Sequence, residues 1–579
     1  MKSNNIYMIL NTKLGLVGVL AFTFMITESC GIKKMVKNAK DISYETTPNP
    51  LELNGDSVKI TVNGNFPEKY FHKKATVLVT PVVKFNGGEK LLKNITLKGD
   101  KIEGNGQSIS YTTGGKFTVK DQFLYQAGME KSEVVLRATV IYKGKNTELP
   151  ELKIADGTIV TPLLLQADYK TISVGDKFDK NPTVTQKSNI YFLVDSWEVR
   201  NIELNSDEMS NIYRFVDKGA KEGSEFVSLN IYGFASPEGE LARNSKLSEN
   251  RADEAYKVML NRFNKAKLKN LAKREGFYTK ITTNFEDWDG LKGMLQSSSV
   301  EGKDQAINII NTVNDPEARE AEFRKMASFD PIYEAYFPKL RRAEINLVAR
   351  LKTRTDEQIS ALAATSSDSL GYEELMYASS LTTDVNQKMA IYNAFARRFP
   401  EDYRGFNNMG YIYMQQGKVN EAQAEFEKAN RISANNPVVQ NNLGAVAAIK
   451  GDKKGAATLF GNAGSATEVT YNKANLAIAN GKYSEASAAY GSTCSFNAAL
   501  AKLLSGNPSG ANQTLDCSTE KETGAAYYLK AVISARNSDK DGVIANLTKA
   551  ISTDKKWKER AKTDLEFRKF TTELGAILN

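Results

Sequence analysis

The chain is nearly devoid of histidine. Only His72 occurs among its 579 residues, which removes most metal centres and most acid–base chemistry. Walker loops, Gly-x-Ser-x-Gly elbows and His-Glu-x-x-His patterns are absent from the sequence as well. A histidine-based triad would have to use His72, which lies in a β-rich region without a recognisable nucleophile. We therefore expect no catalytic residue, no metal site, no cofactor and no enzymatic activity, and we interpret His72 as a surface or packing residue.

Length and charge set broad limits. A chain of 579 residues is long enough for roughly three to four domains. Its 41% apolar and 25% charged residues are typical of globular proteins. The net charge of +9 is spread along the chain. It favours anionic neighbours in general but is too diffuse to predict nucleic-acid binding.

Long apolar runs are also scarce. The clearest run, residues 14–26, follows two lysines and is too short to span a bilayer comfortably, so it fits a secretory signal segment. Cys30 comes just after it, within Ser-Cys-Gly. This pattern resembles a bacterial lipobox, although Glu28 departs from it, and it implies a signal peptide over 1–29 and a lipid on Cys30. The alternative is ordinary cleavage beside an incidental cysteine.

The residues that follow Cys30 are basic rather than acidic. In lipoproteins of Bacteroidota an acidic run at this place marks export to the cell surface. The resemblance therefore implies a lipid-anchored protein of the outer membrane that faces the periplasm.

Cys494 and Cys517 are the remaining cysteines. Each borders a helical pattern, and an antiparallel helix hairpin would bring the two together. In an oxidising compartment such a pair indicates a disulfide. Two buried free thiols are the alternative.

Patterning divides the rest of the chain into four parts. Residues 30–50 are predicted to be a tether. Residues 51–185 contain short alternating strands between turn residues and predict one or two antiparallel sandwiches. Residues 186–352 alternate strand and helix patterns, which predicts an α/β sandwich. Residues 356–579 are helical throughout.

A repeat of 34 residues organises this helical region. Small residues and a phenylalanine recur in register, and 34 residues is the period of tetratricopeptide repeats. A generic helical bundle is the alternative. The members of the two sets are Gly410, Gly417, Ala422, Phe426 and Ala429, followed by Gly444, Gly451, Ala456, Phe460 and Ala463.

Two motifs in residues 186–352 resemble the OmpA-like domains that bind peptidoglycan. The first is Gly-aromatic, then glycine, then Asn-x-x-Leu-Ser-x-x-Arg-Ala, and the second is Leu-Arg-Arg-Ala-Glu-Ile. The first motif comprises Gly233, Phe234, Gly239, Asn244, Leu247, Ser248, Arg251 and Ala252, and the second comprises residues 340–345. Residues 286–338, between the motifs, resemble an insertion seen in Bacteroidota relatives of this domain.

The first motif predicts a carboxylate site at the start of a helix. We expect this helix to open at Ser248, a good N-cap, and to leave free N–H groups beside Arg251. The guanidinium of Arg251 can grip a carboxylate in two places. Ser236 stands where the family has the aspartate that helps to hold diaminopimelate, and Glu238 is a candidate replacement. The resemblance implies Ser236, Glu238, Asn244 and Arg251 as peptidoglycan-binding candidates. A retained fold that has lost its ligand is the alternative.

The second motif contributes Arg341 and Arg342. Arginines on a strand near a domain edge are usually solvated or paired with carboxylates, and we expect the same of these two.

Together these features resemble an outer-membrane lipoprotein of Bacteroidota with an OmpA-like domain and C-terminal tetratricopeptide repeats. The predicted function is to link peptidoglycan to the envelope and to scaffold protein partners on the repeats. The alternative is an accessory scaffold of an outer-membrane assembly, secretion or pilus machine, in which the OmpA-like domain binds no ligand.

Overall fold

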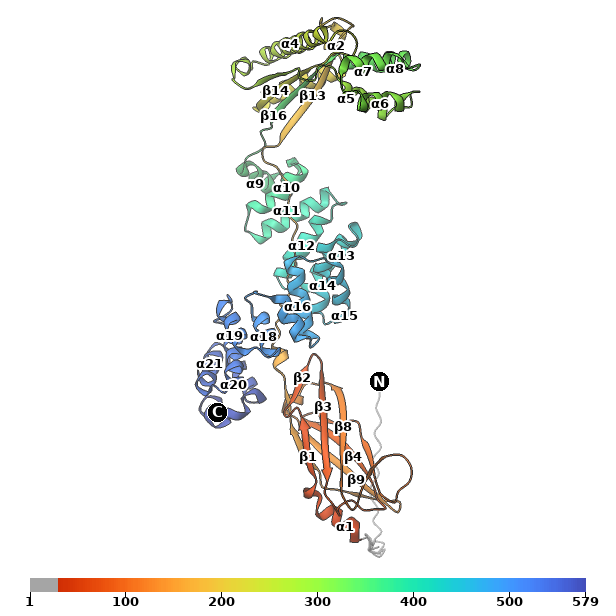
Figure 1. Ribbon diagram of the computed structural model, residues 1–579. Helices are drawn as coiled ribbons and strands as arrows, with labels where there is room; N and C mark the ends of the chain where they lie inside the picture. Colours follow the sequence, from red (N-terminus) through yellow and green to blue (C-terminus); the bar gives the residue numbers. More distant parts are fainter. Residues whose placement is uncertain (1–29) are drawn as a thin grey trace, which may run out of the picture. The chain divides into compact units, whose positions relative to one another are not determined.

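The computed structural model describes residues 30–579 (Figure 1). This part of the chain forms two compact units, one of residues 30–174 and 401–579 and the other of residues 175–400. The predicted signal peptide, 1–29, lies outside the described residues. Within residues 30–579, no helix is both long and apolar enough to cross a membrane.

The N-terminal β-rich region is one sandwich. One sheet has the strand order β1-β3-β2-β12, with β8 paired to β3, and the other has the order β10-β9-β4-β6-β7, with β11 and β5 at its margins. Alternate residues of both sheets face a common core that includes Val58, Val77 and Val140, as expected for half-buried strands. Its elements are α1 (Cys30–Lys37), η1 (Ala39–Asp41), β1 (Ser43–Thr47), β2 (Leu51–Asn54), β3 (Ser57–Phe66), β4 (Thr76–Phe85), β5 (Gly88–Leu91), β6 (Ile95–Gly99), β7 (Gln107–Ile109), β8 (Gly115–Leu124), η2 (Met129–Lys131), β9 (Glu133–Tyr142), β10 (Lys145–Glu148), β11 (Leu152–Asp156), β12 (Thr158–Ile159) and η3 (Thr161–Leu164).

The tether predicted over 30–50 is corrected by the structure. Ile32 and Met35 of α1 are buried in the sandwich core, and β1 pairs with β3 in antiparallel register. A short apolar stripe at helical spacing is enough to dock this segment, because each buried aliphatic side chain contributes about 1.5–3 kcal/mol. The sandwich also ends earlier than predicted, and the chain from residue 166 to 182 lies outside the sheets.

The central region is α/β, with a four-stranded sheet in the order β13-β16-β14-β15. Strand β16 is antiparallel to both of its neighbours, whereas β14 and β15 are parallel. Helices α3 and α4 bury one face each against this sheet, through side chains such as Ile212 and Met259. Its elements are β13 (Thr183–Tyr191), α2 (Asn201–Leu204), α3 (Asp207–Glu222), β14 (Glu225–Gly233), α4 (Leu241–Lys265), η4 (Leu271–Lys273), β15 (Tyr278–Ile281) and β16 (Arg342–Arg350).

Four helices between β15 and β16 form a separate layer with a core of its own. Trp288, Leu291, Phe323 and Phe337 are buried together there. This layer occupies the place where an insertion is expected. The helices are α5 (Trp288–Gln296), α6 (Lys303–Thr312), α7 (Pro316–Arg324) and α8 (Phe329–Leu340).

The remaining described residues are helical, as the 34-residue period predicts. In α12 and α14, Gly410 and Gly444 face the rings of Phe426 and Phe460, and a Cβ atom on either glycine would lie 2.6 Å from the ring. The small residues therefore let paired helices approach closely. In the unit of residues 175–400 the helices are α9 (Asp356–Thr365), η5 (Ser367–Ser369), α10 (Tyr372–Ala378), η6 (Ser379–Leu381) and α11 (Val385–Arg398). In the other unit they are α12 (Tyr403–Gln415), α13 (Val419–Ile432), α14 (Pro437–Ile449), α15 (Lys453–Asn462), α16 (Thr467–Ala479), α17 (Tyr483–Tyr490), α18 (Phe496–Leu504), α19 (Pro508–Cys517), α20 (Gly524–Arg536), α21 (Lys540–Thr553), α22 (Lys556–Ala561), η7 (Leu565–Phe570) and α23 (Thr571–Leu578).

Candidate functional site

The helix that carries the first motif begins at Leu241, not at Ser248 as predicted. Ser248 lies inside α4, is fully buried, and donates its hydroxyl proton to the Ser245 carbonyl at 2.7 Å. No proline or glycine interrupts residues 241–248, so the helix can begin before the expected cap. The free N–H groups expected beside Arg251 are therefore absent, because α4 uses them in its own hydrogen bonds.

Arg251 is a structural residue in this fold. Arg251 is 1% exposed, and its guanidinium donates to the carbonyls of Ser196, Phe234 and Leu193 at 2.9, 2.9 and 3.2 Å. Burial, with a smaller contribution from the charge of Arg341, lowers the pKa of Arg251 to about 10. The prediction that its fork faces an incoming carboxylate is therefore wrong: the fork ties the loop after β13 to the end of β14.

The two loop candidates form a small buried network. Ser236 is 3% exposed and donates to Glu238 Oε1 at 2.7 Å. Glu238 in turn pairs with Arg341 at 3.0 Å, and the exposed fractions of the two side chains are only 14% and 8%. Glu238 is thus already neutralised by a protein cation, as expected for Arg341.

Asn244 connects the loop to the inserted layer. Its Nδ2 donates to the Ser236 and Glu238 carbonyls at 3.2 and 3.1 Å, and to Glu286 Oε1 at 2.8 Å. With 3% of its surface exposed, this amide fixes the shape of the loop.

The structure brings all four candidates to one cavity of about 500 Å³. Ser236, Glu238, Asn244 and Arg251 form its floor. The rim carries exposed charges of both signs, supplied by Asp195, Arg243, Arg324 and Asp330. The buried charges of the floor have partners inside the protein. On the rim, Arg243 pairs with Asp195 at 2.7 Å and Arg324 with Glu320 at 2.5 Å. Both rim arginines are exposed to solvent, so the rim is the part that can meet a charged ligand.

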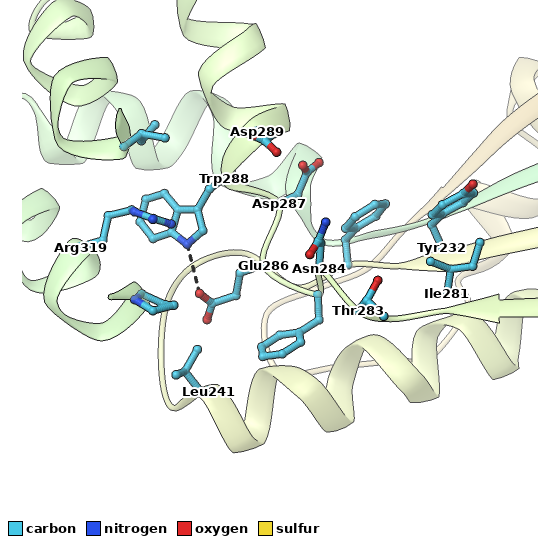
Figure 2. Close-up of a pocket in the computed structure, with 14 residues that line it drawn as sticks. Tyr232, Leu241, Ile281, Thr283, Asn284, Glu286, Asp287, Trp288, Asp289 and Arg319 are labelled. Atoms are coloured by element: carbon cyan, nitrogen blue, oxygen red, sulfur yellow. Dashed lines mark hydrogen bonds between the residues drawn. The ribbon is translucent and has the colours of Figure 1, made fainter. Parts of the chain in front are cut away.

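A second cavity, of about 640 Å³, lies between the end of the sheet and the inserted layer (Figure 2). Trp288 Nε1 donates to Glu286 at 3.2 Å, and Arg319 lies over the Trp288 ring at 5.0 Å. Burial raises the pKa of Glu286 above its ordinary value, against the hydrogen bonds from Asn244 and Trp288. The sequence gave little indication that Glu286 lines a cavity, since neighbouring carboxylates such as Glu286 and Asp287 are common on surfaces.

Other residues singled out in the sequence have structural partners. Arg342 pairs with Asp287 at 2.7 Å, so both arginines of the second motif bind carboxylates. His72 packs edge-on against Tyr142, with ring centroids 4.9 Å apart, in agreement with a packing role. Cys494 and Cys517 are joined by a disulfide, which decides between the two readings of this pair.

The repeats contain a polar feature that the sequence reading missed. Fully or almost fully buried asparagines line the inner helices α12, α14, α16 and α18 and hydrogen-bond the main chain of segment 166–174. They are Asn407, Asn408, Asn441, Asn442, Asn472, Asn475 and Asn497. The recurrence of an Asn-Asn pair at 407 and again at 441, one 34-residue period later, could have revealed them.

Comparison with known proteins identifies the repeats. Residues 403–436 match the sequence model of the tetratricopeptide repeat family, which places this region among protein–protein interaction scaffolds. No curated protein matches the chain.

Solved structures with some likeness include YrrB, described as a TPR protein with an unusual peptide-binding site. It is 18% identical, with 30% of this chain and 97% of YrrB covered and a TM-score of 0.24. A tetratricopeptide repeat protein from Parabacteroides merdae is 14% identical, with 36% and 91% covered and a TM-score of 0.28. PilF of Pseudomonas aeruginosa is 14% identical, with 38% and 100% covered and a TM-score of 0.28. The assignment of the repeats rests on the family match and on the helix packing, not on these low scores.

Proposed function

We propose that this chain is a non-enzymatic, lipid-anchored scaffold of the bacterial outer membrane that faces the periplasm. Its central domain, as an OmpA-like domain, holds peptidoglycan, and its helical repeats hold protein partners. The observation that carries the wall-binding part is the cavity of about 500 Å³ on which Ser236, Glu238, Asn244 and Arg251 converge.

Charge on the cavity rim supports this ligand class. Stem peptides of peptidoglycan end in carboxylates, and diaminopimelate adds an ammonium group. Arg243 and Arg324, with side chains 45% and 50% exposed, are placed to meet a carboxylate, and an arginine fork binds it in two places. Asp330 is placed to meet the ammonium, as is Asp195, which would exchange its exposed ion pair with Arg243 for the ligand. In this proposal the charged side chains of the rim contact the ligand, and Arg251 stabilises the loop that forms the floor of the cavity.

Sedimentation of the mature full-length chain with insoluble peptidoglycan tests this proposal. Arg243→Ala and Arg324→Ala are expected to weaken binding about tenfold each, since each removes a charge-assisted contact. Lys246→Ala, which removes an exposed charge from the same helix α4 away from the cavity, is the matched control. A chain that does not sediment with the wall, or Arg243 and Arg324 variants that sediment like Lys246→Ala, would refute wall binding.

A second candidate is an accessory scaffold of an outer-membrane assembly, secretion or pilus machine. Two observations favour it: Ser236 replaces the acidic residue of the family motif, and Arg251 is committed to three backbone carbonyls. Crosslinking in intact cells distinguishes the two. A stoichiometric membrane partner without wall crosslinks supports the machine, and wall crosslinks without such a partner count against it.

A further inference from the structure

Segment 166–174 runs in extended form across the inner helices of the repeats. Its order is antiparallel to theirs, because Gln166 meets α18 and Val174 meets α12. Alternate residues of the segment bond in turn to α18, α16, α14 and α12. Alternate residues of extended chain point their main-chain polar groups to the same edge, so one edge of the segment faces the helices.

Most of the contacts are made by asparagine carboxamides to the main chain. Asn442 Oδ1 accepts from the Ile172 N–H, and its Nδ2 donates to the Ile172 carbonyl, both at 2.8 Å. Asn472 makes the same pair of bonds to Lys170, both at 2.7 Å. A carboxamide that satisfies both polar groups of one residue takes the place of one residue in a partner strand.

The same arrangement recurs at both ends of the segment. The surface formed by the asparagines of α12, α14, α16 and α18 is called the groove. Asn497 holds both polar groups of Gln166 at 3.0 and 2.9 Å. Asn408 holds both groups of Val174 at 2.8 and 2.7 Å. The groove therefore recognises extended main chain, and these asparagine bonds do not depend on which side chains the bound segment carries.

Bonds between asparagines join the repeats into one network. Asn442 Nδ2 donates to Asn407 Oδ1 and Asn472 Nδ2 donates to Asn441 Oδ1, both at 2.9 Å. The asparagines of α12, α14 and α16 are completely buried. Buried amides are costly when unpaired, so this network requires an occupant in the groove.

Side chains of the segment also fix its register. Tyr169 stacks on Phe460, with ring centroids 6.3 Å apart, and Asp168 accepts a hydrogen bond from the Tyr471 hydroxyl at 2.7 Å. At the N-terminal end, Leu164 is buried in the core of the last repeats. The segment is therefore held by its own side chains as well as by its main chain.

We propose that this groove is a site for extended main chain and that segment 166–174 is its permanent intramolecular ligand, which closes the groove to peptides of partner proteins. The segment is continuous with folded elements on both sides, η3 and β13, so its local concentration is at least millimolar. A partner peptide of similar intrinsic affinity, present at micromolar concentration, therefore cannot displace it. Protein partners of the repeats must then bind outside the groove, whether or not the central domain binds the wall.

A labelled peptide copy of residues 164–176 tests the proposal on the full-length chain. The opened variant Lys170→Pro/Ile172→Pro removes two N–H donors of the segment, since proline has none. The matched control Thr171→Pro/Ser173→Pro changes the neighbouring positions, which are outside the asparagine bonds given above. The peptide is expected to bind the opened variant at least about tenfold more tightly than the wild type or the control. Equal binding to all three chains overturns the closed groove.

Peptide chemistry tests whether main chain is recognised. N-methylation at positions 170 and 172 is expected to weaken binding to the opened variant about tenfold for each bond removed, whereas N-methylation at 171 and 173 leaves it unchanged. An opened variant that is folded by circular dichroism and binds no peptide overturns the main-chain site.

Single variants decide the matter if the opened variant does not fold. Ile172→Pro is expected to raise the rate of proteolytic cleavage within 166–174 at least about tenfold. Ile172→Ala keeps the N–H and Ser173→Pro keeps all the asparagine bonds, so both are expected to be cleaved at the wild-type rate. Equal rates for all the variants overturn the proposal.

Discussion

At the scale of single residues, burial reverses the role that the motif suggests for Arg251. A guanidinium with five donors is a good carboxylate ligand when it is exposed, but Arg251 is 1% exposed and three carbonyls already accept from it. A buried charge must be compensated where it lies. Arg251 therefore holds the loop that shapes the cavity.

Replacing Arg251 is expected to destabilise the central domain. Arg251→Ala removes the side-chain donor of the Ser196 and Phe234 carbonyls and one of two donors to the Leu193 carbonyl. We expect the free energy of unfolding to fall by about 3 kcal/mol. Urea unfolding followed by tryptophan fluorescence in a Trp557→Phe background measures it, because Trp197 and Trp288 then report on the central unit. Arg243→Ala, an exposed control on the same helix, is expected to keep the wild-type urea midpoint. An Arg251→Ala midpoint equal to that of the control would contradict the structural role.

Glu286 makes the stability of the central domain depend on pH. Burial raises the pKa of Glu286 in the folded chain above its ordinary value of 4.5, so the folded state binds this proton more tightly than the unfolded state does. The stability contributed by the protonated carboxyl is complete at low pH and is lost as pH rises through 4.5 toward the raised pKa.

Comparison of the wild type with Glu286→Gln isolates this effect. Unfolding free energies measured between about pH 4 and pH 8 should show the wild type losing stability relative to the variant as pH rises. Above the raised pKa the difference should become constant. Thr283→Ala, an uncharged change at the same cavity, should keep the wild-type pH dependence. A difference that grows in favour of the wild type with pH would contradict this sign.

At the scale of elements, the helix pairs of the repeats depend on close approach at a few glycines. In α14, a Cβ atom at Gly444 would lie 2.6 Å from the Phe460 ring. In α15, a Cβ atom at Gly461 would have open space around it, with none of the surrounding heavy atoms within 4 Å. The two glycines therefore differ in packing although both are helical.

Alanine at these glycines is expected to have opposite effects. Gly444→Ala should destabilise the repeats by about 2 kcal/mol through overpacking, and Phe460→Leu in the same chain should recover part of the loss. Gly461→Ala should stabilise them by up to about 1 kcal/mol, because alanine is the better helix former. Thermal unfolding followed by circular dichroism measures both. A stabilising Gly444→Ala would show that the helices do not pack this closely.

At the scale of the whole molecule, the folded segment that begins at Cys30 determines how a lipid anchor would act. Because Ile32 and Met35 are buried in the sandwich core, no flexible tether separates Cys30 from the β sandwich. A lipid on Cys30 would hold the sandwich directly at the membrane surface.

Lipidation at Cys30 is itself testable. We expect metabolic labelling with a fatty acid to mark the wild-type chain and to be lost in Cys30→Ser, which should also leave the membrane fraction. Cys494→Ser is the control and should stay labelled, since Cys494 pairs with Cys517. If the Cys30→Ser chain is still labelled, the lipid is on another residue and Cys30 is not the anchor.

Periodicity in the sequence determined much of this architecture. The alternating strands, the βα pattern and the 34-residue recurrence of Gly410 and Phe426 each follow from which face of an element must be buried. Because this information is local, the sandwich, the central sheet and the repeats were predicted close to their observed places. The convergence of Ser236, Glu238, Asn244 and Arg251 was predicted by motif resemblance.

Only the tertiary structure decided what these residues are free to do. Ser248 resembled a helix cap by its residue type. The helix nevertheless begins at Leu241, because no proline or glycine in residues 241–248 prevents it. The partners of Arg251 come from two segments, the loop after β13 and the end of β14, and the main-chain partner of Asn442 lies 270 residues away in sequence. Such contacts depend on how distant segments pack, which no local pattern encodes. Packing therefore made the predicted ligand residue Arg251 a structural residue, and placed segment 166–174 on the inner helices of the repeats that were predicted to bind protein partners.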